Sequence, residues 1–208
     1  IADDVDGDDD TAPDRDEGYV LRPDPAAPFA VVSDIDDTIL RTGLAEGLSS
    51  VGRTLFGDSQ SRQAIGGMSS FYRGIQRGIT VDGPRTPAPA WFYLSTGSWS
   101  FYEMLVQFLQ LRGFPRGPLF LTDWGPSQRY LHRSGAMHKQ HTLRRLMTSY
   151  PDTQFVLIGD AGQGDFGAYT AAAREFPDQI KDIFIIPAGK TERVEELRAE
   201  AASLRAAG

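Results

Sequence analysis

The stretch "VVSDIDDTIL", residues 31–40, decides the fold and points to the chemistry. It opens with a β-branched pair that is typical of a buried strand, and it then places three carboxylates, Asp34, Asp36 and Asp37, within four positions. Like charges this close repel one another, so the end of a purely structural strand would rarely carry them. The stretch therefore predicts a buried strand whose carboxyl end carries a functional site.

Length and composition predict a domain of ordinary size with a real core, because the chain has 208 residues of which 40% are apolar. Cysteine is absent from the sequence, which excludes disulfides, a thiol nucleophile and cysteine-based metal sites. No apolar run approaches the roughly 18 residues that cross a bilayer, and no secretory signal is visible. We therefore expect a cytoplasmic protein without a transmembrane segment or a nucleic-acid partner. A first residue of Ile1 is typical of a fragment or a processed form.

Charge is distributed unevenly along the chain, whose formal net charge is −7. Residues 3–17 hold nine acidic side chains and one arginine, a net −8, so the remainder carries +1. The segment lacks the ligand spacing of a calcium-binding EF-hand loop, and a solvated acidic tail is the better interpretation. The proline-rich run "RPDPAAP" then reads as a stiff linker. We expect a tail and linker over residues 1–28 and a catalytic domain over residues 29–208.

Apolar runs alternate with helical patterns through the rest of the chain. Continuous apolar runs, the pattern of strands covered on both faces, occur at residues 29–33, 91–95, 118–122, 154–159 and 182–186. Helical patterns fall at residues 99–112, 137–149, 165–176 and 190–206. The alternation predicts an α/β fold with a doubly wound, Rossmann-like parallel sheet. Residues 44–79 interrupt it and predict a small helical, cap-like insertion after the first strand.

Ligands of open parallel sheets bind beyond the carboxyl ends of the strands, so the residues at those ends are the candidates for a site. These candidates, with one lysine from the helix before the fourth strand, are Asp34, Asp36, Thr38, Ser95, Thr96, Asp160 and Lys139. Carboxylates that converge in this way need a cation to neutralise them. Oxygen ligands of this kind suit Mg²⁺, which the sequence therefore predicts as the cofactor.

Several blocks of the sequence resemble a known family. "SDIDDTI" has the DxDxT form of the haloacid dehalogenase superfamily of phosphatases, and "FYLST", "HK" and "IGDAGQGD" look like its later motifs. Together with "LFLTDWG", these blocks follow the order found in the catalytic domain of the actin-patch-associated phosphatidate phosphatases of fungi and their bacterial relatives. The resemblance covers about residues 29–190.

The resemblance implies a catalytic role for each of three residues. Asp34 would be the nucleophile that forms an aspartyl-phosphate, a task for which a carboxylate needs nearby positive charge. Lys139 would supply part of that charge by linking Asp34 to the phosphate. Asp36 would act as the general acid and base, and its main-chain carbonyl would bind the metal.

The remaining roles implied by the resemblance concern the turn, the phosphate and the metal. Thr38 would hold the turn, and Thr38, Ser95 and Thr96 would bind the phosphoryl group. Asp160 would bind Mg²⁺ with Asp34 and Asp36, while Asp165 would bind it through water or orient its ligands.

The function implied is that of a Mg²⁺-dependent hydrolase of lipid metabolism, a phosphatase acting on phosphatidate at a membrane surface. Two alternatives are a phosphatase for a soluble phosphomonoester and a non-catalytic module that binds phospholipid or phosphate. Asp36 favours an enzyme, since a binding module needs no acid or base. Gly97, Ser98 and Ala161 differ from the residues common at these places in the relatives, which leaves the exact substrate open.

Some of these residues also have structural interpretations. For Asp37 we favour the interpretation of a helix cap or a solvated charge. Ser95 could cap the following helix, and Lys139, taken by itself, is typical of a surface lysine. Asp123 and Trp124 could reach the rim of the site, although Asp123 in a turn is more often structural.

Two other patterns carry no site. "GQGDFG", residues 162–167, fits the dinucleotide-binding fingerprint but follows a late strand, so we exclude nicotinamide binding. His132, His138 and His141 lack the spacing of zinc ligands and are interpreted as surface or outer-layer residues.

The insertion carries four arginines, Arg53, Arg62, Arg73 and Arg77, against two acids. The structural interpretation is that its apolar residues pack on the sheet while the arginines are solvated. The functional hypothesis is a cap that touches an anionic membrane and delivers the lipid headgroup.

Overall fold

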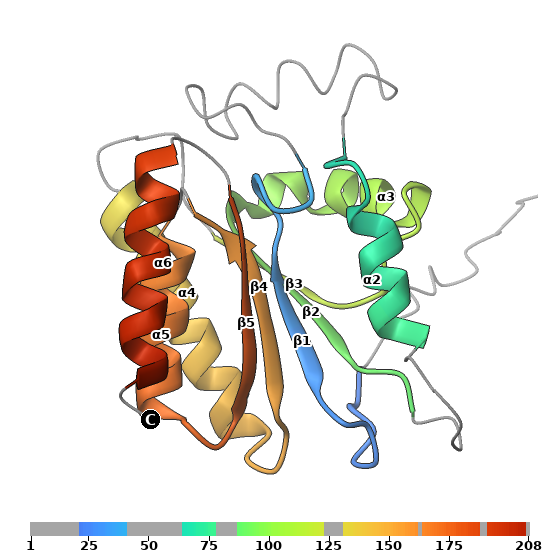
Figure 1. Ribbon diagram of the computed structural model, residues 1–208. Helices are drawn as coiled ribbons and strands as arrows, with labels where there is room; N and C mark the ends of the chain where they lie inside the picture. Colours follow the sequence, from blue (N-terminus) through green and yellow to red (C-terminus); the bar gives the residue numbers. More distant parts are fainter. Residues whose placement is uncertain are drawn as a thin grey trace, which may run out of the picture.

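A five-stranded parallel sheet forms the centre of the molecule (Figure 1). The computed structural model describes residues 21–40, 64–77, 87–122, 131–161, 164–187 and 191–206. The strands are β1 (Ala30–Asp34), β2 (Trp91–Ser98), β3 (Leu119–Thr122), β4 (Phe155–Asp160) and β5 (Ile180–Ile186). Their order in the sheet is β3-β2-β1-β4-β5. The predicted α/β fold with a doubly wound parallel sheet is confirmed.

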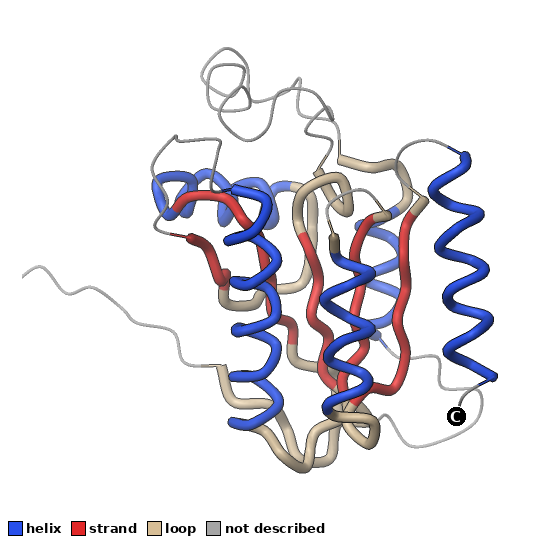
Figure 2. The backbone as a smooth tube through the Cα atoms, turned by 90° about the vertical axis from the view of Figure 1, so that its left-hand side faces the viewer, coloured by secondary structure: helices blue, strands red, loops and turns tan. Residues whose placement is uncertain are grey.

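Helices cover both faces of the sheet, which explains why the strands are continuous apolar runs. On one face lie α2 (Met68–Arg77) and α3 (Tyr102–Leu111), the latter preceded by the short 3₁₀ helix η1 (Trp99–Phe101). The opposite face is covered by α4 (Leu131–Ser149) and α5 (Asp165–Glu175). Helix α6 (Thr191–Ala206) packs against α5 and β5. Figure 2 shows the same layers turned by 90°, with helices on either side of the strands.

Successive residues of a strand supply the two cores in turn. Val31 of β1 and Val156 of β4 face the core under α2 and α3, while Val32 and Leu157 face the core under α4 and α5. The alternation is that of any pleated strand, but here both faces are apolar. The carboxyl end of each strand therefore emerges between two packed layers.

The direction in which successive strands are added to the sheet changes at β1, while all strands stay parallel. Strands β2 and β3 extend the sheet on one side of β1, and β4 and β5 extend it on the other. The adjacent carboxyl ends of β1 and β4 thus form the topological switch point, where open α/β sheets bind their ligands. Asp34 ends β1 and Asp160 ends β4, so these two carboxylates flank the switch point.

The described part of the predicted insertion, residues 64–77, belongs to the core. Met68 and Tyr72 are buried against the sheet, and the ring of Tyr72 stacks on that of Trp91 with 4.8 Å between centroids. In this described part, apolar residues pack on the sheet, as the structural interpretation of the insertion expects. Most of the predicted cap lies outside the described residues, as does the acidic tail over residues 1–20, so both stay predictions.

Helix α2 carries the two described arginines of the membrane hypothesis, which stays a prediction. It follows Ala64, which pairs with Leu40 in the turn after β1. From there the helix runs along the sheet, away from the carboxyl end of β1 (Figure 1). Its ten residues span about 15 Å, so Arg77 lies a full helix length from the start. Arg73 and Arg77 are exposed, whereas Arg53 and Arg62 fall outside the described ranges. Among the described helices, none has the length and apolar character needed to span a bilayer.

Candidate active site

A tight turn follows β1 and carries the acidic motif back toward the sheet. The amide nitrogens of Ile39 and Leu40 donate to the carbonyl of Ile35 at 3.0 and 3.1 Å, and the amide of Asp37 donates to the carbonyl of Leu40 at 2.8 Å. Asp37 has a φ of 56°, the left-handed region in which Asp, Asn and Gly are favoured. It is only 8% exposed, so the interpretation of Asp37 as a solvated charge is wrong. The alternative of a helix cap stays a prediction, because residues 41–63 lie outside the described residues.

The ammonium group of Lys139 lies between two carboxylates. Helix α4 brings Lys139 to the carboxyl end of β1, where its Nζ donates to Asp34 Oδ1 at 2.6 Å and also to Asp165 Oδ1. Lys139 is 1% exposed, which rules out the alternative of a surface lysine. These three residues come from β1, α4 and α5, so the folded sheet is what brings them together.

Asp165 also organises the end of β4. Its Oδ2 accepts a hydrogen bond from the backbone amide of Asp160 at 3.1 Å. Gly159 makes this approach possible, because a Cβ there would lie 2.6 Å from Asp165 Oδ2. Carboxylate oxygens of Asp34, Asp160 and Asp165 lie within 4.8 Å of one another, close enough to share a metal ion.

The side chain of Asp36 pairs with the end of β2. Ser95 Oγ donates to Asp36 Oδ2 at 2.7 Å, and the amide of Gly97 donates to Ser95 Oγ at 2.9 Å. The side chain that caps η1 is that of Ser98, whose Oγ accepts from the amide of Ser100 at 3.3 Å. Ser95 is therefore not the helix cap that one interpretation of the sequence allowed.

The two predicted threonines lie at different depths. Thr38 is fully buried in the turn after β1, and its Oγ1 has no hydrogen-bond partner among the described residues. Thr96 is partly exposed where β2 meets α4, and a Cβ on Gly135 would lie 2.9 Å from its methyl group. Its carbonyl accepts from Thr122 Oγ1 at 2.9 Å, so its backbone is fixed to β3.

Burial and mutual repulsion shape the protonation of the site. Burial and the Asp165 carboxylate raise the pKa of Asp34 above its ordinary value, with Lys139 opposing them. Burial also raises the pKa of Asp36, and the hydrogen bond from Ser95 offsets part of that rise. Burial alone would lower the pKa of Lys139, but the carboxylates of Asp34 and Asp165 raise it overall. The lysine is therefore a fixed positive charge.

The donor set fits a divalent cation. Four buried carboxylates, those of Asp34, Asp36, Asp160 and Asp165, meet the single charge of Lys139 in this part of the described chain. Asp34 Oδ2 and Asp36 Oδ1 have no hydrogen-bond partner among the described residues. Buried carboxylates with such oxygens are stabilised by a bound cation, and an all-oxygen set is what Mg²⁺ prefers.

The structure places the histidines and the rim residues away from this cluster or leaves them undescribed. His138 Nε2 lies 3.4 Å from the carbonyl of Phe120, and His141 is exposed. Asp123, Trp124 and the side chain of His132 lie outside the described residues, and so do Gly162 and Gln163 of the rejected dinucleotide pattern.

Sequence reasoning missed two residues beneath the site. Ser33 Oγ donates to the carbonyl of Asp34 at 2.7 Å, and the Tyr72 hydroxyl lies 2.7 Å from Ser33 Oγ. The signal for Ser33 was its polar side chain within an otherwise apolar strand. Tyr72 offered no comparable signal, because it lies 39 positions away in the insertion.

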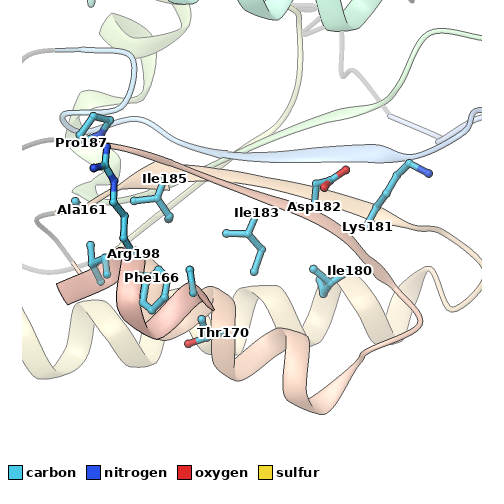
Figure 3. A pocket seen from close by; sticks show the side chains of 12 residues that line it. Ala161, Phe166, Thr170, Ile180, Lys181, Asp182, Ile183, Ile185, Pro187 and Arg198 are labelled. Carbon is cyan, nitrogen blue, oxygen red and sulfur yellow. The ribbon is translucent and has the colours of Figure 1, made fainter. Parts of the chain in front are cut away.

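A cavity of about 400 Å³ opens beside the cluster, between β5, α5 and α6 (Figure 3). Ala161, Pro187 and Arg198 lie at one end, and Ile180 and Lys181 lie at the other. None of the predicted site residues lines it. Ala161 and Phe166, which line it, are the residues just after Asp160 and Asp165.

Comparison with known proteins identifies the family of the chain. The family described as "Phosphatidate phosphatase APP1, catalytic domain" matches residues 29–186, which include every strand and all the residues of the carboxylate cluster. The chain belongs to this family. The resemblance seen in the sequence motifs is thereby confirmed.

Two curated relatives each match about three quarters of the chain. Phosphatidate phosphatase APP1 of Saccharomyces cerevisiae is 31% identical over 158 residues, and an uncharacterized protein of Schizosaccharomyces pombe is 28% identical over 159 residues. Each match takes in 76% of this chain and 25% of the relative, so the shared region is about a quarter of the length of either relative.

Proposed function

We propose that the domain is a Mg²⁺-dependent phosphomonoester hydrolase that acts on phosphatidate through an aspartyl-phosphate on Asp34. The observation that carries the proposal is the position of Asp34 at the switch point of the sheet, bonded to Lys139 through Oδ1 and close to Asp160. The name of the yeast relative, a phosphatidate phosphatase, supports the choice of substrate.

Asp34 would attack phosphorus with a carboxylate oxygen while Lys139 holds the side chain in place. The buried ammonium offsets the repulsion between a carboxylate and a phosphate dianion, which is the main obstacle to this step. The bond from phosphorus to the alkoxide of the lipid breaks as the aspartyl-phosphate forms. Hydrolysis of that intermediate then returns Asp34 to its carboxylate form.

Asp36 would move the protons. Burial raises the pKa of Asp36, so it can hold a proton for the leaving alkoxide before the first step, whereas the positive charge of Lys139 opposes the same effect of burial on Asp34. The resulting carboxylate then accepts a proton from the water that hydrolyses the intermediate. The hydrogen bond from Ser95 Oγ at 2.7 Å fixes Asp36 for both tasks.

Asp34, Asp160 and the main-chain carbonyl of Asp36 would hold the Mg²⁺, which when bound neutralises charge on the phosphoryl oxygens. Both oxygens of Asp165 already accept hydrogen bonds, one from Lys139 and one from the amide of Asp160. We therefore assign Asp165 to orienting these two residues rather than to direct metal binding.

The hydroxyl groups of Ser95 and Thr96 would bind the phosphoryl oxygens from the end of β2, and Thr38 would hold the turn that carries Asp36. Because phosphatidate is a membrane lipid, the proposal includes peripheral contact of the domain with a membrane surface. The cytoplasmic leaflet is the expected location.

A substrate panel tests the proposal. The purified domain is assayed with Mg²⁺ against phosphatidate in mixed micelles, lysophosphatidate and glycerol 3-phosphate, with and without excess chelator. We expect chelator-sensitive release of phosphate from phosphatidate, and no turnover by Asp34→Asn, which keeps the shape of the side chain. A preference for glycerol 3-phosphate would show that the substrate is a soluble ester and not the lipid. Binding of phosphatidate without any phosphate release would instead indicate a non-catalytic module.

A further inference from the structure

Two buried hydroxyl groups form a chain that ends on the backbone of Asp34. Ser33 Oγ donates to the Asp34 carbonyl at 2.7 Å, and the Tyr72 hydroxyl lies 2.7 Å from Ser33 Oγ. The single proton of the Ser33 hydroxyl is committed to the carbonyl, so Tyr72 donates to Ser33. Ser33, Asp34 and Tyr72 are all 0% exposed, so water does not compete for these bonds.

Tyr72 is rigidly held at the far end of this chain. Its ring stacks on Trp91, with 4.8 Å between centroids and 28° between planes, and meets Phe114 edge-on at 5.3 Å. Burial raises the pKa of the Tyr72 hydroxyl, so it remains a protonated donor. A buried phenol in an apolar cluster needs one partner, and Ser33 provides it.

The near end of the chain acts on the residue that we assign as nucleophile. Asp34 is the last residue of β1, beyond which the backbone turns sharply through Ile35. A hydrogen bond to the Asp34 carbonyl fixes the peptide plane at the point where regular strand geometry ends. The direction of the Asp34 side chain, and hence its bond to Lys139, depends on that plane.

We propose that Tyr72 and Ser33 are positioning residues for Asp34. Helix α2, which carries Tyr72, belongs to the described part of the insertion, and it sits on the face of the sheet opposite α4 and α5. The insertion thereby controls the nucleophile from beneath, through Tyr72 and Ser33, while Lys139 holds it from the other side. This inference rests on the proposed function for its kinetic consequence, but its structural part does not.

The test compares two matched tyrosine variants. Tyr72→Phe removes the hydroxyl that reaches Ser33. Tyr93→Phe removes an equally buried hydroxyl on the same face, whose bond of 2.8 Å goes to the carbonyl of Pro115 instead. Both rings lie near Trp91, so the two changes carry similar packing and hydrogen-bond costs.

We expect Tyr72→Phe and Ser33→Ala each to lower kcat about 10-fold or more, the usual effect of removing a group that orients a ligand, with KM little changed. The kcat of the double variant should be no lower than that of the less active single variant, because the two residues act as one chain. Tyr93→Phe should lower the melting temperature as much as Tyr72→Phe does while keeping kcat. Equal kcat values for Tyr72→Phe and Tyr93→Phe would overturn the inference.

Calorimetric titration with Mg²⁺ gives a readout that does not need turnover. Tyr72→Phe and Ser33→Ala should weaken Mg²⁺ binding several-fold relative to Tyr93→Phe, because Asp34 is one of the proposed ligands. If the parent hydrolyses none of the esters, the proposed function fails, and this titration still decides the positioning role. Identical Mg²⁺ affinities in all three variants would refute that role.

Discussion

Asp34 and Asp36 stand two positions apart in the sequence, yet the fold gives them different surroundings. Asp34 bonds to the ammonium of Lys139, whereas Asp36 bonds to the neutral hydroxyl of Ser95. Two carboxyl groups in different environments can take different protonation states, which is what a nucleophile and a general acid require. The roles that we propose for them rest on these partners more than on their order in the motif.

The role of Asp36 predicts that Asp36→Asn depends on the leaving group. With phosphatidate, whose alkoxide needs a proton, kcat/KM should fall by about 10² to 10⁴-fold. With p-nitrophenyl phosphate the loss of kcat/KM should be much smaller, because a nitrophenolate leaves without a proton. The comparison uses kcat/KM, which reports the step that forms the aspartyl-phosphate and not its later hydrolysis, in which Asp36 would act as the base with both esters. Equal losses for both would show that Asp36 is not the acid.

At the scale of the elements, the site depends on how closely α5 approaches β4. Gly159 permits that approach, since a Cβ there would meet Asp165 Oδ2 at 2.6 Å and a ring carbon of Tyr169 at 2.8 Å. The neighbouring atoms belong to a helix packed on the strand, so they cannot move independently. The hydrogen bond from the Asp160 amide to Asp165 requires the same closeness.

Gly159→Ala should therefore lower the free energy of unfolding by about 1–3 kcal/mol, the usual cost of overpacking a core. Gly74→Ala is the matched control: nothing lies within 4 Å of its added methyl group, and in helix α2 it should stabilise by about 0.5–1 kcal/mol. Urea unfolding of both variants measures these changes. Gly159→Ala with the stability of the parent would contradict the geometry of this contact.

The elements themselves were predictable where one local pattern dominates. All five strands lie within a few residues of their predicted positions, because continuous apolar runs mark strands covered on both faces. Helix α4 begins at Leu131, six residues before the predicted start. Gly135 reads as a break in the sequence, whereas in the fold it allows α4 to approach Thr96.

The carboxylates of the candidate site were predictable because strand ends in a parallel sheet meet at one edge. The hydrogen-bonding partners of these carboxylates were harder to predict from the sequence. Whether Ser95 caps a helix or reaches Asp36 depends on the position of Ser98, which takes the cap. The pairing of Tyr72 with Ser33 joins residues 39 positions apart through an insertion, and no local pattern encodes such a contact.

For the whole molecule, the proposed Mg²⁺ site predicts that folding and metal binding are interdependent. Repulsion among the buried carboxylates should destabilise the metal-free fold, and a cation that binds only the folded state should stabilise it. At a Mg²⁺ concentration 100 times the dissociation constant the gain should be about 2.7 kcal/mol.

Thermal unfolding in chelator and in increasing Mg²⁺ measures this gain as a rise in melting temperature. Asp160→Asn removes a proposed ligand while nearly keeping its shape, and it should shift the rise to higher Mg²⁺ concentration. Glu175→Gln, which changes an exposed carboxylate paired with Arg144, should respond to Mg²⁺ as the parent does. A melting temperature of the parent that is insensitive to Mg²⁺ would contradict the proposed metal site.

Chemical trapping of the intermediate tests the central claim most directly. The enzyme is quenched during turnover of phosphatidate and treated with borohydride, which reduces an aspartyl-phosphate to homoserine, and its peptides are analysed by mass spectrometry. The account predicts homoserine at position 34, dependent on substrate and Mg²⁺ and absent from Asp34→Asn. Homoserine at another aspartate, or none during undiminished turnover, would contradict the assignment of Asp34 as the nucleophile.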